Sequence, residues 1–348
     1  MAPFTQFMLM FGLGLGMTIT LSASHWLIAW IGLEINTLAI IPMMSCYPHP
    51  RATEATTKYF VAQATATATL LFAAAMNAWL TGQWSVWSVP HPLPTWITIL
   101  ALSAKMGLAP FHTWVPEVLQ GVDLISGLIL STWQKLAPLC LILQLPIHPE
   151  LLLPYMGVFS AFVGGLGGLN QTQLRKVLAY SSITHLGWMF IILGFSRNMA
   201  VLAFMAYTIM TSALFLSLNF FSVKTINGLS TSWSKCRVLA TSIPFTLFSL
   251  GGLPPFAGFL PKWMIIQQLL NEGLPEFALV LAFASLLSLY FYLRLAYALA
   301  LTVSPLTLPY ILVWRLPRGH TMILLSITVT VSIMALPLTP AVLAALSL

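Results

Sequence analysis

The chain has 348 residues, of which 59% are hydrophobic and only 6% are charged, and its mean hydropathy is +0.91. A soluble domain carries about a quarter charged residues, so these figures exclude an ordinary water-soluble globular protein and indicate that a lipid bilayer surrounds most of the chain. The net charge of +7 comes from 14 Lys and Arg against 7 Asp and Glu. Basic residues this few and scattered exclude a groove that follows nucleic-acid phosphates.

Apolar windows of about twenty residues, the length of a transmembrane helix, recur along the whole chain. The window 240–270 is too long for one simple helix and has Gly and Pro in its middle, so we expect an interrupted helix there. We therefore predict an all-α membrane protein of about eleven transmembrane helices. The predicted spans are 3–22, 24–45, 58–80, 93–116, 121–143, 151–170, 176–195, 198–222, 240–270, 275–300 and 321–340.

Basic residues are distributed unevenly between the two predicted sides of the membrane. One side carries only Arg197, together with Glu150, Glu272 and Glu276. Since Lys and Arg concentrate in cytoplasmic loops, the N-terminus is expected on the cytoplasm-equivalent side and the C-terminus on the other. The basic residues of the N-terminal side are Arg51, Lys58, Arg175, Lys176, Lys224, Lys235, Arg237, Arg294, Arg315 and Arg318.

One internal repeat is visible. Residues 107–117 read GLAPFHTWVPE and residues 252–262 read GLPPFAGFLPK, with Gly, Leu, Pro, Phe and the second Pro in register. The copies fall in the fourth and ninth predicted helices, which run in opposite directions. This pattern predicts two inverted five-helix repeats, 1–145 and 146–300, each with a Pro-broken helix, followed by a loop and a final helix in 301–348.

Paired broken helices mark the transport site in many secondary transporters. The proline residues of the repeat free backbone groups that can hold water or ions, although a simple kink is the alternative interpretation for any one of them. The predicted helix-break residues are Pro110, Pro254, Pro255 and Pro261, and Pro116 belongs to the same set.

Four charged residues lie within predicted helices rather than at their ends: Glu34, Lys105, Lys135 and Lys262. An ionised side chain at mid-bilayer costs about 2.5–3.5 kcal/mol, so these residues should face the bundle interior. The alternative is a set of buried ion pairs that only fix helix packing, but three lysines cannot all pair with one glutamate.

Burial lowers the pKa of a lysine and a nearby carboxylate raises it again. A lysine whose carboxylate moves away therefore becomes a proton donor. Our hypothesis is that Glu34 controls the proton affinity of Lys105 in this way and that Lys135 and Lys262 continue the relay. His112 and His185 are further relay candidates, the alternative being histidines that bond only to a backbone carbonyl.

The sequence predicts neither a metal site nor a cofactor site in this chain. Cys46, Cys140 and Cys236 are far apart and form no Cys/His cluster. The glycines at 12–16 and 164–168 follow no strand, so we interpret them as positions of close helix packing rather than as phosphate-binding loops.

Four segments together resemble the antiporter-like membrane subunits of respiratory complex I, and the similarity extends over essentially the whole chain. In that family the residues that match Glu34 and Lys105 form a charged pair, Lys135 matches a central lysine, and Lys262 matches an exit-side lysine. The segments are HWLIAWIGLEIN at 25–36, KMGLAPFHTWVPE at 105–117, AYSSITHLG at 179–187 and GGLPPFAGFLPK at 251–262.

The resemblance implies a proton-pumping subunit in the mitochondrial inner membrane, with the N-terminus in the matrix and the C-terminus in the intermembrane space. Its partners would be other membrane-arm subunits and lipid. NADH, FMN, iron–sulfur clusters and ubiquinone would bind to other subunits. Family members typically have fourteen helices, and the helices missing from this chain correspond to the first three. A subunit of a multisubunit cation/proton antiporter and a non-pumping structural subunit remain the alternatives.

Overall fold

The structure is a computed structural model that describes residues 3–46, 49–146, 152–234, 236–301, 321–338, 340–341 and 344. Within these ranges the chain forms helices and no strand, so the predicted all-α fold is confirmed. Seven helical segments of the described residues are long and apolar enough to cross a membrane, one of them, Leu124–Gln144, with an interruption, and three more apolar helices are shorter. The number eleven therefore stays a prediction. Four of the charged residues used to predict the orientation, Glu150, Lys235, Arg315 and Arg318, lie outside the described residues.

The chain divides into two compact units, Met1–Leu152 and Leu153–Leu348. The first unit is built on tight packing of its first two helices. A side chain at Gly16 would come within 2.8 Å of Asn36 Oδ1, and one at Gly32 would come within 3.0 Å of the Gly16 carbonyl, so glycines allow this approach. Gly14, by contrast, has open space around it. The helices are α1 (Pro3–Ser22), α2 (Trp26–Met44), α3 (Pro50–Thr81), α4 (Pro92–Met106), α5 (Trp114–Gly121), α6 (Leu124–Ser131) and α7 (Trp133–Gln144).

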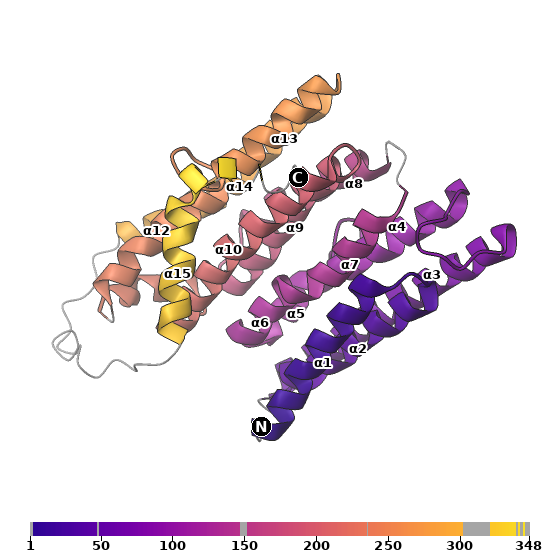
Figure 1. The fold of residues 1–348 in the computed structure, drawn as a ribbon. Coiled ribbons are helices and arrows are strands. Elements are labelled where there is room, and N and C mark those ends of the chain that lie inside the picture. Colours follow the sequence, from indigo (N-terminus) through magenta and orange to yellow (C-terminus); the bar gives the residue numbers. More distant parts are fainter. Residues whose placement is uncertain are drawn as a thin grey trace. The chain divides into compact units, whose positions relative to one another are not determined.

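The second unit surrounds α9, whose residues 181–193 are all buried. Gly164 and Gly168 of α8 lie against Thr184 and Phe291, which confirms that the glycines at 164–168 serve close packing. The elements, drawn in Figure 1, are α8 (Leu152–Gly168), α9 (Leu174–Leu193), α10 (Arg197–Phe221), α11 (Ile226–Leu229), η1 (Ser230–Ser234), α12 (Arg237–Gly251), α13 (Phe259–Asn271), α14 (Pro275–Ala300), α15 (Thr321–Met334) and η4 (Leu336–Leu338).

Three predicted spans are interrupted rather than continuous. The span 93–116 divides into α4 and α5, and the span 240–270 divides into α12 and α13, as the Gly and Pro residues there predict. The span 121–143 also divides, between α6 and α7, which was not expected. At this point the backbone of Thr132 adopts φ of −113° and ψ of −66°, and the Leu128 carbonyl accepts from both the Thr132 N–H at 3.0 Å and the Thr132 hydroxyl at 2.7 Å.

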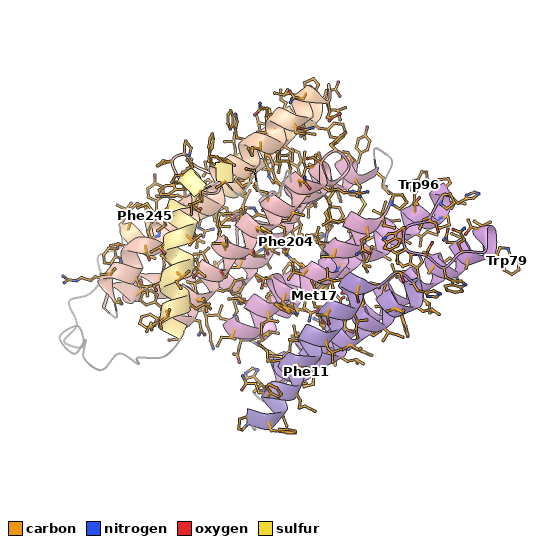
Figure 2. The ribbon with its side chains drawn as sticks, in the orientation of Figure 1. Phe11, Met17, Trp79, Trp96, Phe204 and Phe245 are labelled. Carbon is orange, nitrogen blue, oxygen red and sulfur yellow. The ribbon has the colours of Figure 1, made fainter. Side chains whose placement is uncertain are left out.

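Tryptophans at the ends of the predicted spans behave differently from one another. Figure 2 shows Trp79 and Trp96 projecting from the ends of α3 and α4, and both are exposed, as expected for an aromatic belt. Trp26, at the start of α2, is only 1% exposed. It packs into the core of the first unit and does not belong to such a belt.

Candidate functional site

The two copies of the repeat end their helices in the same way. Gly107 and Gly252 both adopt left-handed backbone conformations, with φ of +80° and +78°. In each copy the N–H of the following leucine donates to a carbonyl five residues back, at 3.0 Å and 3.1 Å, which is the Schellman helix ending. The peptide bonds before Pro110 and Pro255 are both cis. Only glycine adopts the left-handed region freely, which explains why the glycine is common to both copies.

A helix that ends in this way leaves carbonyl groups unpaired at its C-terminus, where the helix dipole stabilises positive charge. The sequence places a lysine at each of these ends. Lys105 lies in the last turn of α4. Lys262 lies in α13, but its Nζ donates to the carbonyl of Gly251, the last residue of α12, at 2.8 Å. The Lys262 ammonium group is therefore placed at the negative end of α12, and Lys105 lies in the last turn of the corresponding helix of the first unit.

Lys105 is buried, with only 5% of its surface exposed. Its carbonyl accepts a hydrogen bond of 3.2 Å from Gln63 Nε2 on α3. Glu34 on α2 is partly buried and interacts electrostatically with Lys105, while its Oε2 accepts from the Thr37 hydroxyl at 3.1 Å. The two residues predicted as a pair thus interact, although no direct ion pair joins them among the described residues.

Trp114 closes the interruption in the first unit. Its indole N–H donates to the Ala104 carbonyl in the last turn of α4 at 3.2 Å, and the same carbonyl also accepts from the Gly107 N–H at 3.2 Å. The indole also packs edge-on against Tyr59 of α3, with ring centroids 5.7 Å apart. Trp114 therefore holds the first turn of α5 against the end of α4.

Lys135 is also buried, at 3% exposure, and lies in the first turn of α7, beside the unexpected interruption. The residues next to it bond α7 to its neighbours. Trp133 Nε1 donates to the Leu13 carbonyl of α1 at 3.4 Å, and Gln134 Nε2 donates to the Asn36 carbonyl of α2 at 3.2 Å. Helix α7 packs against both α2 and α4. The first unit therefore brings Glu34, Lys105 and Lys135 into one bundle.

Lys262 belongs to the second unit. Besides the Gly251 carbonyl, its ammonium group faces the ring of Trp188 on α9 at 5.8 Å from the ring centroid, within range of a cation–π interaction. The lysine stem runs across Gly252, where a side chain would come within 2.7 Å of Lys262 Cδ. Gly252 is therefore needed both for the backbone turn and for the path of Lys262.

His185 lies in the buried part of α9 among hydroxyl groups that were not predicted as functional. Its Nε2 is 3.4 Å from the Tyr292 hydroxyl, and its ring centroid is 5.5 Å from that of Tyr207. The two tyrosine hydroxyls are hydrogen-bonded to Ser182 and Ser181. A search for charged residues misses the two tyrosines because their hydroxyl groups carry no charge, but the polar run at 181–185 inside an apolar helix was a usable signal.

The remaining predicted residues lie at the interruptions. His112 is partly buried, and its Nδ1 is 3.3 Å from the Pro110 carbonyl, which is the kind of backbone contact expected under the alternative interpretation. Pro254 and Pro255 lie in the non-helical segment between α12 and α13. Pro261 lies in the first turn of α13, where proline is tolerated because the first N–H groups of a helix have no partner.

Comparison with solved structures and family models defines the class of protein. Residues 23–288 match the family model described as NADH:quinone oxidoreductase/Mrp antiporter, TM. The fold is similar to a chain of respiratory complex I from Thermus thermophilus with bound aureothin, with a TM-score of 0.80 and 27% identity over 97% of this chain and 80% of that one. It is also similar to a chain of the Mrp complex from Dietzia, with a TM-score of 0.74 and 19% identity over 83% of this chain and 58% of that one. The latter identity supports the fold only.

Residues 289–343 match a second family model, the C-terminus of NADH dehydrogenase subunit 2. NADH-ubiquinone oxidoreductase chain 2 of Tetraodon nigroviridis is 57% identical over 99% of both chains, and that of Oncorhynchus mykiss is 54% identical over the full length of both. The chain belongs to the NADH-ubiquinone oxidoreductase chain 2 family.

Proposed function

We propose that the chain is a proton-translocating subunit of the membrane arm of NADH:ubiquinone oxidoreductase in the mitochondrial inner membrane. One observation carries this proposal. Each of the three lysines inside the helices, Lys105, Lys135 and Lys262, lies in the helical turn next to an interruption. Interrupted helices expose backbone groups that can bind water or ions where a membrane would otherwise exclude them. A lysine beside such a group can therefore exchange a proton.

The proposed cycle begins with a change in the distance between Glu34 and Lys105. When the carboxylate is near, it stabilises the ammonium, and when it withdraws, the lysine releases its proton toward Lys135. Moving one charge against 100 mV costs about 2.3 kcal/mol, and a change of two pKa units in one lysine supplies about 2.7 kcal/mol. In the second unit His185 and the tyrosine hydroxyls would lead to Lys262.

The remaining parts of the proposal concern the surroundings of the chain. NADH, FMN, iron–sulfur clusters and ubiquinone would act in other subunits, so this chain contributes to the enzyme without a redox site of its own. Its partners would be other membrane-arm subunits and lipid. Its N-terminus would face the matrix and its C-terminus the intermembrane space, with residues 1–145 and 146–300 as inverted repeats.

A native gel of gently solubilised membranes tests the assignment to the complex. The chain should migrate with a very large band that oxidises NADH. Pumping is tested with Lys105→Met in the assembled complex, which should lower the number of protons moved per NADH without loss of assembly. Lys224→Met is the matched control. Because Lys224 is exposed, its substitution should change neither the number of protons moved per NADH nor the assembly of the complex. Wild-type pumping in Lys105→Met would refute the proposed role.

A cation/proton antiporter without an NADH-oxidising partner is the second candidate, since the matched family model includes Mrp antiporters. In that case the chain would migrate apart from the NADH-oxidising band, and transport would depend on sodium. The third candidate is a structural subunit that moves no protons itself. In that case Lys262→Ala should leave the number of protons pumped by the assembled complex unchanged.

A further inference from the structure

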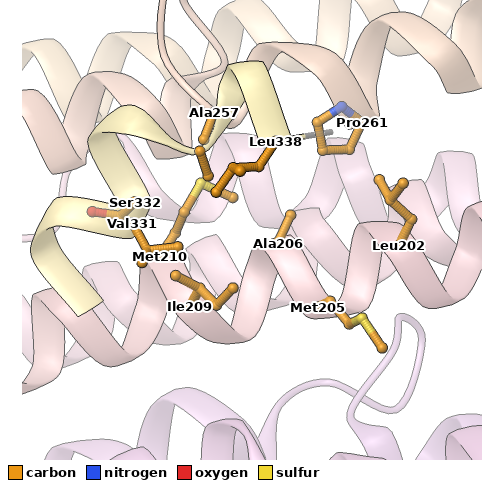
Figure 3. A pocket seen from close by; sticks show the side chains of 11 residues that line it. Leu202, Met205, Ala206, Ile209, Met210, Ala257, Pro261, Val331, Ser332 and Leu338 are labelled. Atoms are coloured by element: carbon orange, nitrogen blue, oxygen red, sulfur yellow. The ribbon is translucent and has the colours of Figure 1, made fainter. Parts of the chain in front are cut away.

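An apolar cavity of about 180 Å³ lies in the second unit between α10, α13 and the C-terminal elements α15 and η4 (Figure 3). Its wall includes Ala257, in the segment that interrupts the helix, and Pro261, in the first turn of α13. Pro261 immediately precedes Lys262. The cavity therefore adjoins the interrupted helix from a side that the proposed proton path does not use.

The lining offers no polar partner to a ligand. All lining residues except Ser332 are apolar. The Ser332 hydroxyl donates to the Val329 carbonyl at 2.8 Å, and the Ser332 carbonyl accepts from the Ser249 hydroxyl at 2.8 Å. In Figure 3 the Ser332 hydroxyl points away from the other labelled side chains. A polar headgroup or a water molecule would lose hydrogen bonds in this cavity, whereas a hydrocarbon would not.

The cavity can be reached from the surrounding hydrocarbon. Met205 and Leu338, two of its lining residues, are 47% and 60% exposed. Met205 lies on α10, one of the helices long and apolar enough to span a membrane. The medium around such a helix is the acyl region of the bilayer, and flexible methionine side chains adapt readily to an inserted chain.

The size of the cavity fits part of such a chain. An apolar cavity of roughly 150 Å³ in another protein stays dry and binds benzene, and this cavity is about 180 Å³. If it stayed empty, its lining would lose dispersion contacts. We propose that this cavity binds the acyl chain of a membrane phospholipid, which packs between α10 and α15 and supports the segment that carries Ala257 and Pro261.

The test is photolabelling of the intact complex in its membrane with phosphatidylcholine that carries a diazirine in its acyl chain, followed by peptide mapping. Labels should appear on residues of the cavity wall such as Met205, Ile209 and Val331. Ala206→Leu and Ala335→Leu, which fill the cavity from α10 and from the segment after α15, should each lower this labelling about tenfold, since each displaces roughly two methylene groups of the bound chain. Ala282→Leu, on the exposed face of α14, is the matched control and should leave it unchanged.

The wild-type map is decisive by itself if neither filling variant assembles. Labels on exposed α14 without labels on Ile209 or Val331 would show that another subunit or nothing occupies the cavity, and would overturn the proposal. Equal labelling of the cavity wall in the wild type and in an assembled filling variant would overturn it as well. None of these outcomes depends on whether the chain pumps protons.

Discussion

Two substitutions of Lys262 distinguish whether this residue carries a proton or only supplies a positive charge to the structure. The substitution Lys262→Met removes the ammonium group and keeps most of the length of the side chain, so the surface of Gly252 stays covered. Lys262→Arg instead keeps a positive charge and hydrogen-bond donors, but a guanidinium group does not release its proton in a protein. We expect both variants to assemble and both to lose proton transfer at this position.

The contacts of Lys262 predict a small change in stability for Lys262→Met. The hydrogen bond of 2.8 Å to the Gly251 carbonyl is charge-assisted and contributes about 1.5–3 kcal/mol. The cation–π contact with Trp188 at 5.8 Å contributes about 0.5–2 kcal/mol. Against these losses, removing a charge from within the membrane recovers about 2.5–3.5 kcal/mol. The two sides cancel to within about 2.5 kcal/mol, so the variant should fold and assemble.

The measurement is the number of protons moved per NADH oxidised by the purified complex in sealed vesicles, together with the thermal midpoint of the complex. Both variants should keep a near-wild-type midpoint and show a lowered proton number. If Lys262→Arg pumped like the wild type while Lys262→Met did not, position 262 would need only a charge, and the proposed proton release there would be wrong. Wild-type pumping by both variants would remove Lys262 from the path.

Substitutions at four further positions test the surroundings of the site. Gly273→Ala should lower the free energy of unfolding by about 1–2 kcal/mol, through its left-handed backbone alone, because nothing lies within 4 Å of the added methyl. Gly252→Ala should lower the thermal midpoint further than Gly273→Ala does. It should also reduce pumping, because its methyl would displace the stem of Lys262. Gln63→Leu leaves the buried Lys105 carbonyl without its 3.2 Å donor and should lower the free energy of unfolding by about 1–3 kcal/mol, measured as a lower thermal midpoint. Gln63→Glu should not restore the midpoint, because an ionised carboxylate has no hydrogen to donate to the carbonyl. Lys58→Met removes ion pairs of 2.7 and 2.8 Å with two exposed carboxylates; it should leave the midpoint unchanged at physiological salt, since exposed pairs are screened.

Local signals explain which helix ends were predictable. The interruptions after Met106 and Gly251 were visible because glycine is needed for a left-handed residue and proline cannot continue a helix. The interruption at Thr132 had no such signal, since threonine occurs in intact helices, and only the backbone angles of Thr132, φ of −113° and ψ of −66°, show the difference. The extra turns of α3 before residue 58 were missed because hydropathy detects the membrane-embedded part of a helix and not the polar turns beyond it.

The residues of the site were predictable to different degrees for a similar reason. Lys105, Lys135 and Lys262 were identified because a charge in an apolar window is conspicuous. Tyr207 and Tyr292 were not, because tyrosine is common near membrane interfaces and its hydroxyl is uncharged. Their association with His185 joins α9, α10 and α14, which are far apart in the chain, so no spacing pattern could indicate it.

The sequence by itself determined the membrane environment, the helical class and the two helix endings, because each depends on composition or on the backbone preferences of single residues. Only the tertiary structure decided what the buried charges contact. It placed Lys262 on the carbonyl of Gly251 and against Trp188, and it left Glu34 near Lys105 without a direct ion pair. Such contacts depend on how packed helices orient their side chains, and in a bilayer that orientation is set by close packing and by the need of each polar group for a partner.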